Sequence, residues 1–262
     1  MAKTFESPQS QIDKSPNRGK VRAPVRFLPV ILILLTAALG HAGTLTLQVR
    51  HLWEGKVLDL PTGEITTKAG ETIAITRLSY LLSEPRLLRR GDNESSGDWW
   101  ERDDWFAFVD ASEGTPALTL AGPPAATYTA IQFTVGLDNE TDRSDPNQYR
   151  PKHPLNPLHN NLHWTPQGGY IFLALEGYLH AKEQTGFAYH LGNAPNRMTV
   201  TVPLSLELHT DALVTLDFHL DRLFNREPAF AVAPETSTHS REGDPVAALL
   251  KQRVEQAFTL NG

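Results

Sequence analysis

Short segments in which every second residue is apolar recur along most of the chain, and this alternation constrains the fold more than any other feature. Side chains that alternate with a period of two lie on opposite faces of a β-strand, so each segment predicts a strand with one buried face. We expect strands over residues 44–50, 71–82, 105–110, 128–136, 169–177, 197–208 and 212–218. Turn-forming clusters of Gly, Pro, Asn and Asp separate these segments. The sequence therefore predicts an all-β fold, an antiparallel sandwich built as a single domain.

Two parts of the chain depart from this alternation. Residues 146–167 are rich in Pro, Asn and His and show no periodicity, which predicts a long loop that carries function or lacks order. Near the C-terminus, Asp244 and Pro245 precede apolar residues at helical spacing, so we expect one helix over residues 244–258. A helical turn is expected over residues 221–224, and the polar residues 233–243 are expected to form a mobile linker.

The first 42 residues have the composition of a targeting segment. Six Lys or Arg residues and two acids occupy residues 1–26, and residues 27–39 are almost wholly apolar before the small-x-small sequence Gly40-His41-Ala42. This apolar run is too short to span a membrane, which takes roughly 20 residues. We therefore expect a signal peptide over 1–42 and a mature domain over 43–262, periplasmic or secreted and without a membrane span after cleavage. An uncleaved membrane anchor is the alternative.

The composition excludes several classes of function. The absence of cysteine removes disulfides, thiolate metal sites and a cysteine nucleophile. A net charge of −6, with no basic block in the body of the chain, argues against nucleic acid as a partner. No His-Glu-x-x-His pair, Gly-x-Ser-x-Gly elbow or phosphate-binding glycine loop occurs, so we do not expect an enzyme.

Histidine is the one plentiful metal ligand that remains. The chain has ten histidines, and five of them fall within the 38 residues from 153 to 190. Imidazole suits copper, zinc and nickel, although these spacings match no fixed metal motif. Hydrogen bonding to loop carbonyls is the alternative role for each of them. The candidate ligands, in order of preference, are His163, His159 and His190, followed by His153 and His239.

Trp164 lies directly after His163 in this histidine-rich segment. An intact tryptophan is not normally a metal ligand. Oxidative opening of its pyrrole ring leaves an aniline nitrogen and a carbonyl, and both groups can donate to a metal. Trp164 is therefore a candidate latent ligand, and the alternative is that its indole packs at the end of the sandwich core.

Several blocks of sequence carry a resemblance to a known family. They are His153-Pro-Leu-Asn-Pro, Leu162-His163-Trp164, the segment 169–177 that ends in Glu176-Gly177, and Phe187-Ala-Tyr-His190-Leu-Gly192. With these blocks, nearly all of residues 44–260 resembles the methanobactin-associated periplasmic protein family (MbnP-like). The resemblance implies an exported, β-rich, copper-binding protein that acts in copper acquisition or handling.

The same resemblance implies a partner and a modification. The partner is a dihaem enzyme similar to cytochrome c peroxidase, which oxidises a tryptophan to kynurenine; in related surface proteins kynurenine joins histidines as a copper ligand. Many relatives carry Tyr-Trp-x-Trp, where this chain has His163-Trp164-Thr165-Pro166, so Trp164 is the one candidate left for oxidation in this motif. Some relatives also carry four cysteines, which are absent here.

An acidic loop offers a different metal site. Its four carboxylates follow an expected strand and are those of Asp138, Glu140, Asp142 and Asp145. Calcium prefers oxygen ligands of this kind, although the spacing lacks the glycine and terminal glutamate of an EF-hand. The loop thus predicts either a solvated acidic segment or a calcium-stabilised structural protein.

An aromatic cluster around Trp99, Trp100 and Trp105 offers a third possibility. Aromatic side chains beside acids are typical of surfaces that bind sugars or proteins, which would make the chain a binding module without metal. The same pattern is expected of a strand edge folded onto the core.

Overall fold

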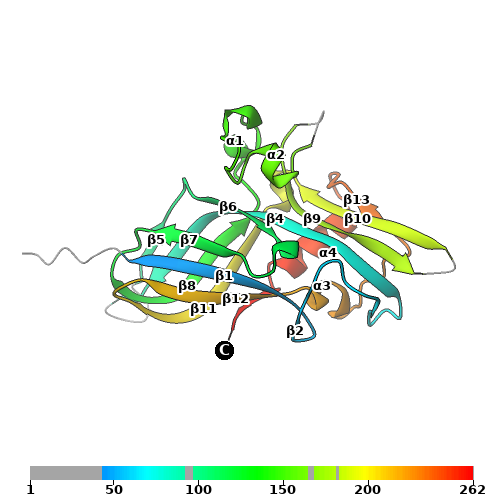
Figure 1. Ribbon diagram of the computed structural model, residues 1–262, viewed down its shortest axis with the longest axis horizontal. Helices are drawn as coiled ribbons and strands as arrows, with labels where there is room; N and C mark the ends of the chain where they lie inside the picture. The colour runs from blue at the N-terminus through cyan, green and yellow to red at the C-terminus, as the bar shows by residue number, and fades with distance from the viewer. Residues whose placement is uncertain (1–42, 92–96, 165–167, 181–182, 262) are drawn as a thin grey trace, which may run out of the picture. The chain divides into compact units, whose positions relative to one another are not determined.

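The computed structural model describes residues 43–91, 97–164, 168–180 and 183–261, which form two β-sheets and a few short helices (Figure 1). The smaller sheet has the strand order β14-β12-β1-β2, and β7 also pairs with β1. Its strands are β1 (Thr44–Trp53), β2 (Lys56–Val57), β7 (Ala117–Ala121), β12 (Ala212–His219) and β14 (Phe258–Leu260).

The larger sheet has the order β11-β8-β4-β9-β10-β13, and β3, β5 and β6 also pair with β4. Its strands are β3 (Ile65–Thr66), β4 (Thr72–Arg89), β5 (Trp99–Glu101), β6 (Phe106–Asp110), β8 (Ala126–Val135), β9 (Ile171–His180), β10 (Gln184–Gly192), β11 (Met198–Leu208) and β13 (Ser237–Thr238). Each of the seven segments predicted from alternation forms a strand, so the all-β sandwich is confirmed.

The long strand β4 organises the larger sheet. One of its edges pairs with β9 through residues 72–80 and then with β8 through residues 82–89, while the other edge pairs with β3, β6 and β5. The change of partner falls between Tyr80 and Leu82, just before a register shift between Ser83 and Arg86, where Glu84 has a φ of 52°. Such a bulge bends a strand and breaks its ladder. The chain between β8 and β9 therefore leaves and rejoins the sheet near this junction, and its helices α1 and α2 lie together at the top of Figure 1.

The expectation of purely antiparallel pairing is wrong for two pairs of strands. Strand β12 runs parallel to β1, from Leu45 opposite Ala212 to Leu52 opposite His219, and β13 runs parallel to β10. Parallel neighbours require a long crossover connection. Most of the larger sheet lies between β1 and β12 in the sequence and supplies that connection.

The C-terminal helix is shorter than predicted. Helix α4 (Pro245–Val254) begins where expected, and the side chain of Asp244 accepts hydrogen bonds from the backbone N–H groups of Val246 and Ala247. It ends before Phe258, which instead enters strand β14 beside β12. The other short helices are η1 (Ala111–Glu113), α1 (Asn139–Asp142), η2 (Pro146–Gln148), α2 (Pro157–Asn160), η3 (Ala194–Asn196) and α3 (Asp221–Asn225).

The expectation of a mobile linker over residues 233–243 is also wrong. Strand β13 lies in this segment, and both Thr238 and Ser240 are buried. Buried backbone requires hydrogen-bond partners, which the neighbouring strand β10 supplies. We call residues 236–244 the strap, because they run along β10 and are fixed to it.

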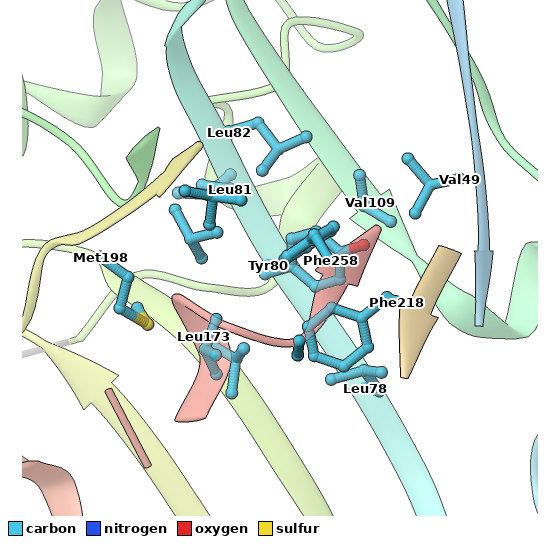
Figure 2. Packing of buried hydrophobic residues seen from close by; sticks show 14 of the residues in the cluster. Val49, Leu78, Tyr80, Leu81, Leu82, Val109, Leu173, Met198, Phe218 and Phe258 are labelled. Carbon is cyan, nitrogen blue, oxygen red and sulfur yellow. The ribbon is translucent and has the colours of Figure 1, made fainter. Parts of the chain in front are cut away.

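The core lies between the two sheets, and an aromatic cluster fills its centre (Figure 2). Tyr80 of β4 stacks on Phe218 of β12 at a centroid distance of 5.7 Å, and Phe258 of β14 meets Phe218 edge-on at 4.7 Å. Leu78 and Val109 surround this cluster, and all of these side chains are buried. Complete burial of one such side chain contributes roughly 1.5–3 kcal/mol.

None of the helices in the described ranges is long and apolar enough to cross a membrane. The predicted signal peptide, residues 1–42, lies outside the described residues and stays a prediction.

Candidate metal site

A cavity of about 670 Å³ lies beside the C-terminal end of β10, between the strap and the segment that leads into β9. Three residues that the sequence predicts for a copper site, Trp164, His190 and His239, line this cavity. The remaining lining residues are Arg143, Gly168, Ile171, Asn193 and Arg241. Residues far apart in the sequence thus meet at one place.

His190 is held from the neighbouring strand. It lies on β10, and its Nε2 is 2.9 Å from Oε1 of Glu176 on β9. Nη1 of Arg77 donates to the same carboxylate oxygen, also at 2.9 Å. The hydrogen bond with His190, assisted by the positive charge of Arg77, holds the pKa of Glu176 below its usual range. The Glu176 carboxylate therefore holds the imidazole of His190, and Arg77 in turn holds that carboxylate.

The strap brings His239 to His190. Because β13 pairs in parallel with β10 and Tyr189 lies opposite Thr238, the next residue on each side is a histidine. The two imidazole centroids are 5.5 Å apart. Ser240 follows with a φ of 57°; its Oγ accepts from the N–H of Gly192 at 2.8 Å and donates to the carbonyl of His190 at 2.9 Å. These two hydrogen bonds anchor the strap directly after His239.

Trp164 approaches from the other side of the cavity. Its backbone N–H donates to the carbonyl of Gly169, and its carbonyl accepts from the N–H of Gly168. A Cβ atom at Gly192 would lie 2.8 Å from two carbons of the indole ring, closer than real contacts allow. The half-buried indole therefore packs on the backbone of β10 two residues beyond His190, and only glycine leaves room for it.

His163, the first-choice ligand, has different neighbours. It forms an isolated bridge with Tyr170 and meets the Tyr170 ring edge-on at 4.9 Å. His163 is not among the residues that line the cavity, whereas Trp164 is. Burial lowers the pKa of His163, and the nearby carboxylate of Asp142 opposes that shift.

His153 packs on an aromatic ring of the same loop region, and His159 packs on an aromatic ring of strand β6. The ring of His153 stacks on Tyr149 at 4.6 Å, and its Nδ1 accepts from the N–H of Leu155. Burial lowers the pKa of His153. His159 is exposed and meets Phe108 edge-on at 5.4 Å. For His153, these contacts match the alternative in which loop histidines fix an irregular segment.

The described residues contain no group of three or more His, Asp or Glu side chains arranged to hold a metal ion. The cavity thus has two imidazoles and an indole, which is not a donor. Copper is commonly held by imidazole, and the two rings are close enough to share one ion. The protein atoms present therefore fit a copper ion in part, with a third donor still to be supplied.

Three of the four carboxylates of the acidic loop accept hydrogen bonds from separate backbone groups. Asp138 caps α1 by accepting from the N–H groups of residues 140 and 141, and Asp145 caps η2. Asp142 is buried and accepts from the N–H of Tyr170 at 2.7 Å. Glu140 is exposed. Asp142 thus differs from the expected solvated acid, and calcium binding stays a prediction.

The aromatic cluster belongs to the edge of the larger sheet. Trp100 and Trp105 are half-buried and pack against the core, and Trp105 Nε1 donates to the carbonyl of Thr119 at 2.8 Å. The guanidinium of Arg86 lies 4.9 Å from the ring centroid of Trp99. These contacts favour the second interpretation, a strand edge folded onto the core.

Sequence reasoning missed the polar residues that support the cavity. The sequence did not point to Glu176, Arg77 or Ser240 as site residues. Glu176 and Ser240 both bond to His190, and Arg77 holds Glu176. A signal was present for Glu176, since it is the single charged residue within the apolar run of residues 170–179. A buried strand retains a charge of this kind where it has a partner. Arg77 and Ser240 have no comparable signal.

Comparison with known proteins agrees with this fold. A solved structure described as MbnP from Methylosinus trichosporium superimposes with a TM-score of 0.56 and 14% sequence identity, covering 80% of this chain and 87% of that chain. At this identity the similarity shows the fold alone. No curated protein matches the sequence. The family model for MbnP matches residues 42–240, a range that includes Trp164, His190 and His239. The chain belongs to the MbnP family.

Proposed function

We propose that this chain is an exported copper-binding protein that acts in copper acquisition or handling, and that Trp164 is oxidised to complete its copper site. The observation that carries the proposal is the meeting of His190, His239 and Trp164 around one cavity. Membership of the MbnP family supports the copper-related role and an export route that ends in the periplasm or outside the cell. The proposal gives the chain no catalytic reaction of its own.

The pair of imidazoles is suited to hold the copper ion. The centroid of a ligating imidazole lies roughly 3 Å from its metal, so two rings 5.5 Å apart can share one ion. The chain has no cysteine, so thiolates cannot compete for the metal. Because both histidines lie on paired backbone, β10 and the strap, little ordering is required when copper binds. We therefore prefer His190 and His239 over His163 as copper ligands, because the ring of His163 packs on Tyr170.

Oxidation of Trp164 supplies the missing donor. A peroxidase-like haem enzyme would use two molecules of peroxide, reduced to water, to add two oxygen atoms across the C2–C3 bond of the indole and break it. Hydrolysis then releases the formyl group as formate and leaves kynurenine. Its aniline nitrogen and carbonyl would project from the ring edge opposite the one that packs against Gly192, and the residue lines the same cavity as both histidines. The volume of about 670 Å³ leaves space around that ring.

Copper titration of single variants tests the site. We expect His190→Ala and His239→Ala each to weaken copper binding by about tenfold or more, because each removes a ligand. Trp164→Phe should weaken it similarly in protein produced with the haem enzyme, since phenylalanine keeps a ring but cannot be opened. His159→Ala is the matched control, because this exposed imidazole lies on Phe108. Unchanged affinity in the first three variants, or a loss in His159→Ala alone, contradicts the proposal.

A further inference from the structure

Three charged or polar side chains line up across three adjacent strands of the larger sheet. Arg77 of β4 lies directly opposite Glu176 of β9, and His190 of β10 is two residues along from Ala188, which is opposite Glu176. Directly opposite and diagonal residues on one face are within reach of each other. Oε1 of Glu176 accordingly contacts both Nη1 of Arg77 and Nε2 of His190 at 2.9 Å.

Arg77 is itself fixed at three points. Besides Glu176, its Nε donates to Oγ of Ser79 at 2.9 Å, and its Nη2 donates to the carbonyl of Asn161 at 3.0 Å. Asn161 lies three residues before Trp164, so one guanidinium connects the tryptophan segment to Glu176. An arginine held in this way stabilises the ionised form of a carboxylate.

The direction of the hydrogen bond between Glu176 and His190 follows from the negative charge of the carboxylate. An ionised carboxylate only accepts hydrogen bonds, so Nε2 of His190 is the donor. A neutral imidazole carries one N–H, and the lone pair is then on Nδ1. We infer that Glu176, held by Arg77, is a positioning residue that keeps His190 in the Nε2–H tautomer and leaves Nδ1 as its copper-binding nitrogen. This inference rests on the proposed function.

The arrangement also fixes the orientation of the imidazole ring. Partners behind a ligating histidine typically change metal affinity by about 10- to 100-fold when they are removed. Glutamine at position 176 has nearly the shape of glutamate, yet its amide both donates and accepts. Its oxygen must still face Arg77 and would therefore still accept from His190, but without the negative charge, so Glu176→Gln weakens the preference for the Nε2–H tautomer with little change in packing.

The first test is a spectroscopic measurement on metal-free protein. Nitrogen-15 NMR of histidine-labelled mature protein, at about pH 8 where an ordinary imidazole is neutral, distinguishes protonated from unprotonated ring nitrogens. We expect His190 of the wild type to show a protonated Nε2 and an unprotonated Nδ1, and Glu176→Gln to show a larger share of the other tautomer. A protonated Nδ1 in the wild type overturns the inference, whether or not any variant folds.

The second test is copper affinity with a matched control. Glu84→Gln removes a carboxylate that also pairs with an arginine and is equally exposed, 31% against 30% for Glu176. We expect Glu176→Gln to weaken copper binding by about 10- to 100-fold and Glu84→Gln to leave it unchanged. Equal affinity in Glu176→Gln and the wild type overturns the inference while the copper site stands. A wild type that binds no copper overturns the proposed function instead, and the tautomer measured without metal separates the two failures.

Discussion

Acidification should destabilise the fold through one buried histidine, His51. Its side chain lies on β1 in the core, and the residue is 2% exposed. Nε2 lies 3.0 Å from the Tyr80 hydroxyl, and Nδ1 has no hydrogen-bond partner among the described residues. Burial lowers the pKa of His51 to about 4, and the negative charge of Asp110 only partly opposes this shift.

The sign and size of the effect follow from proton binding. In the unfolded chain His51 has an ordinary pKa of 6.5, so between pH 6.5 and about 4 the unfolded state binds a proton that the folded state does not. The stability that depends on neutral His51 is therefore fully present above pH 6.5 and falls as the pH drops from 6.5 to about 4. A pKa that falls from 6.5 to about 4 corresponds to about 3 kcal/mol of unfolding free energy.

Urea denaturation of the mature domain at a series of pH values measures this loss. Between about pH 7.5 and pH 4, the wild type should lose about 3 kcal/mol more stability than His51→Gln, whose side chain does not titrate. His209→Gln removes an exposed imidazole and should keep the pH dependence of the wild type. The comparison uses the change with pH, so a lower stability of His51→Gln at neutral pH does not affect it. The reasoning is refuted if His51→Gln loses as much stability as the wild type.

Three further outcomes are expected around the cavity. Gly192→Ala should destabilise the fold by about 1–3 kcal/mol in urea denaturation, because its Cβ would overlap the carbonyl oxygen of Tyr170 and the Trp164 ring. Gly186→Ala on the same strand meets nothing closer than 4.0 Å and should be neutral at this site. Ser240→Gly keeps the left-handed backbone but removes the hydroxyl that anchors the strap, so copper titration should show weaker binding through His239. Copper affinity should also fall on acidification, since protons compete with the metal for imidazole nitrogens.

Much of the fold was predictable because the alternation of apolar residues is a local signal. Each predicted strand has one face in the core, and the start of α4 follows from Asp244 and Pro245 alone. The pairing of those strands is not local. The parallel register of β1 with β12, and the entry of Phe258 into β14 rather than α4, depend on neighbours that are distant in the sequence.

The candidate site shows the same division between local and distant information. The candidate residue types follow from the sequence, and the expectation that Trp164 is oxidised follows from its histidine-rich surroundings and from the resemblance to a family. The choice among histidines was not, because His239 reaches His190 only through the pairing of the strap with β10. His163 was preferred for its place beside Trp164, yet its ring packs on Tyr170 and does not line the cavity.

The chemical state of Trp164 in copper-loaded protein from its own cells tests the central claim most directly. Peptide mass spectrometry should find at this position the gain of two oxygen atoms and the loss of one carbonyl, as kynurenine requires. The four other tryptophans, Trp53, Trp99, Trp100 and Trp105, should be unmodified. An intact Trp164 in protein that carries its full complement of copper would contradict the account, because the third donor would then come from elsewhere.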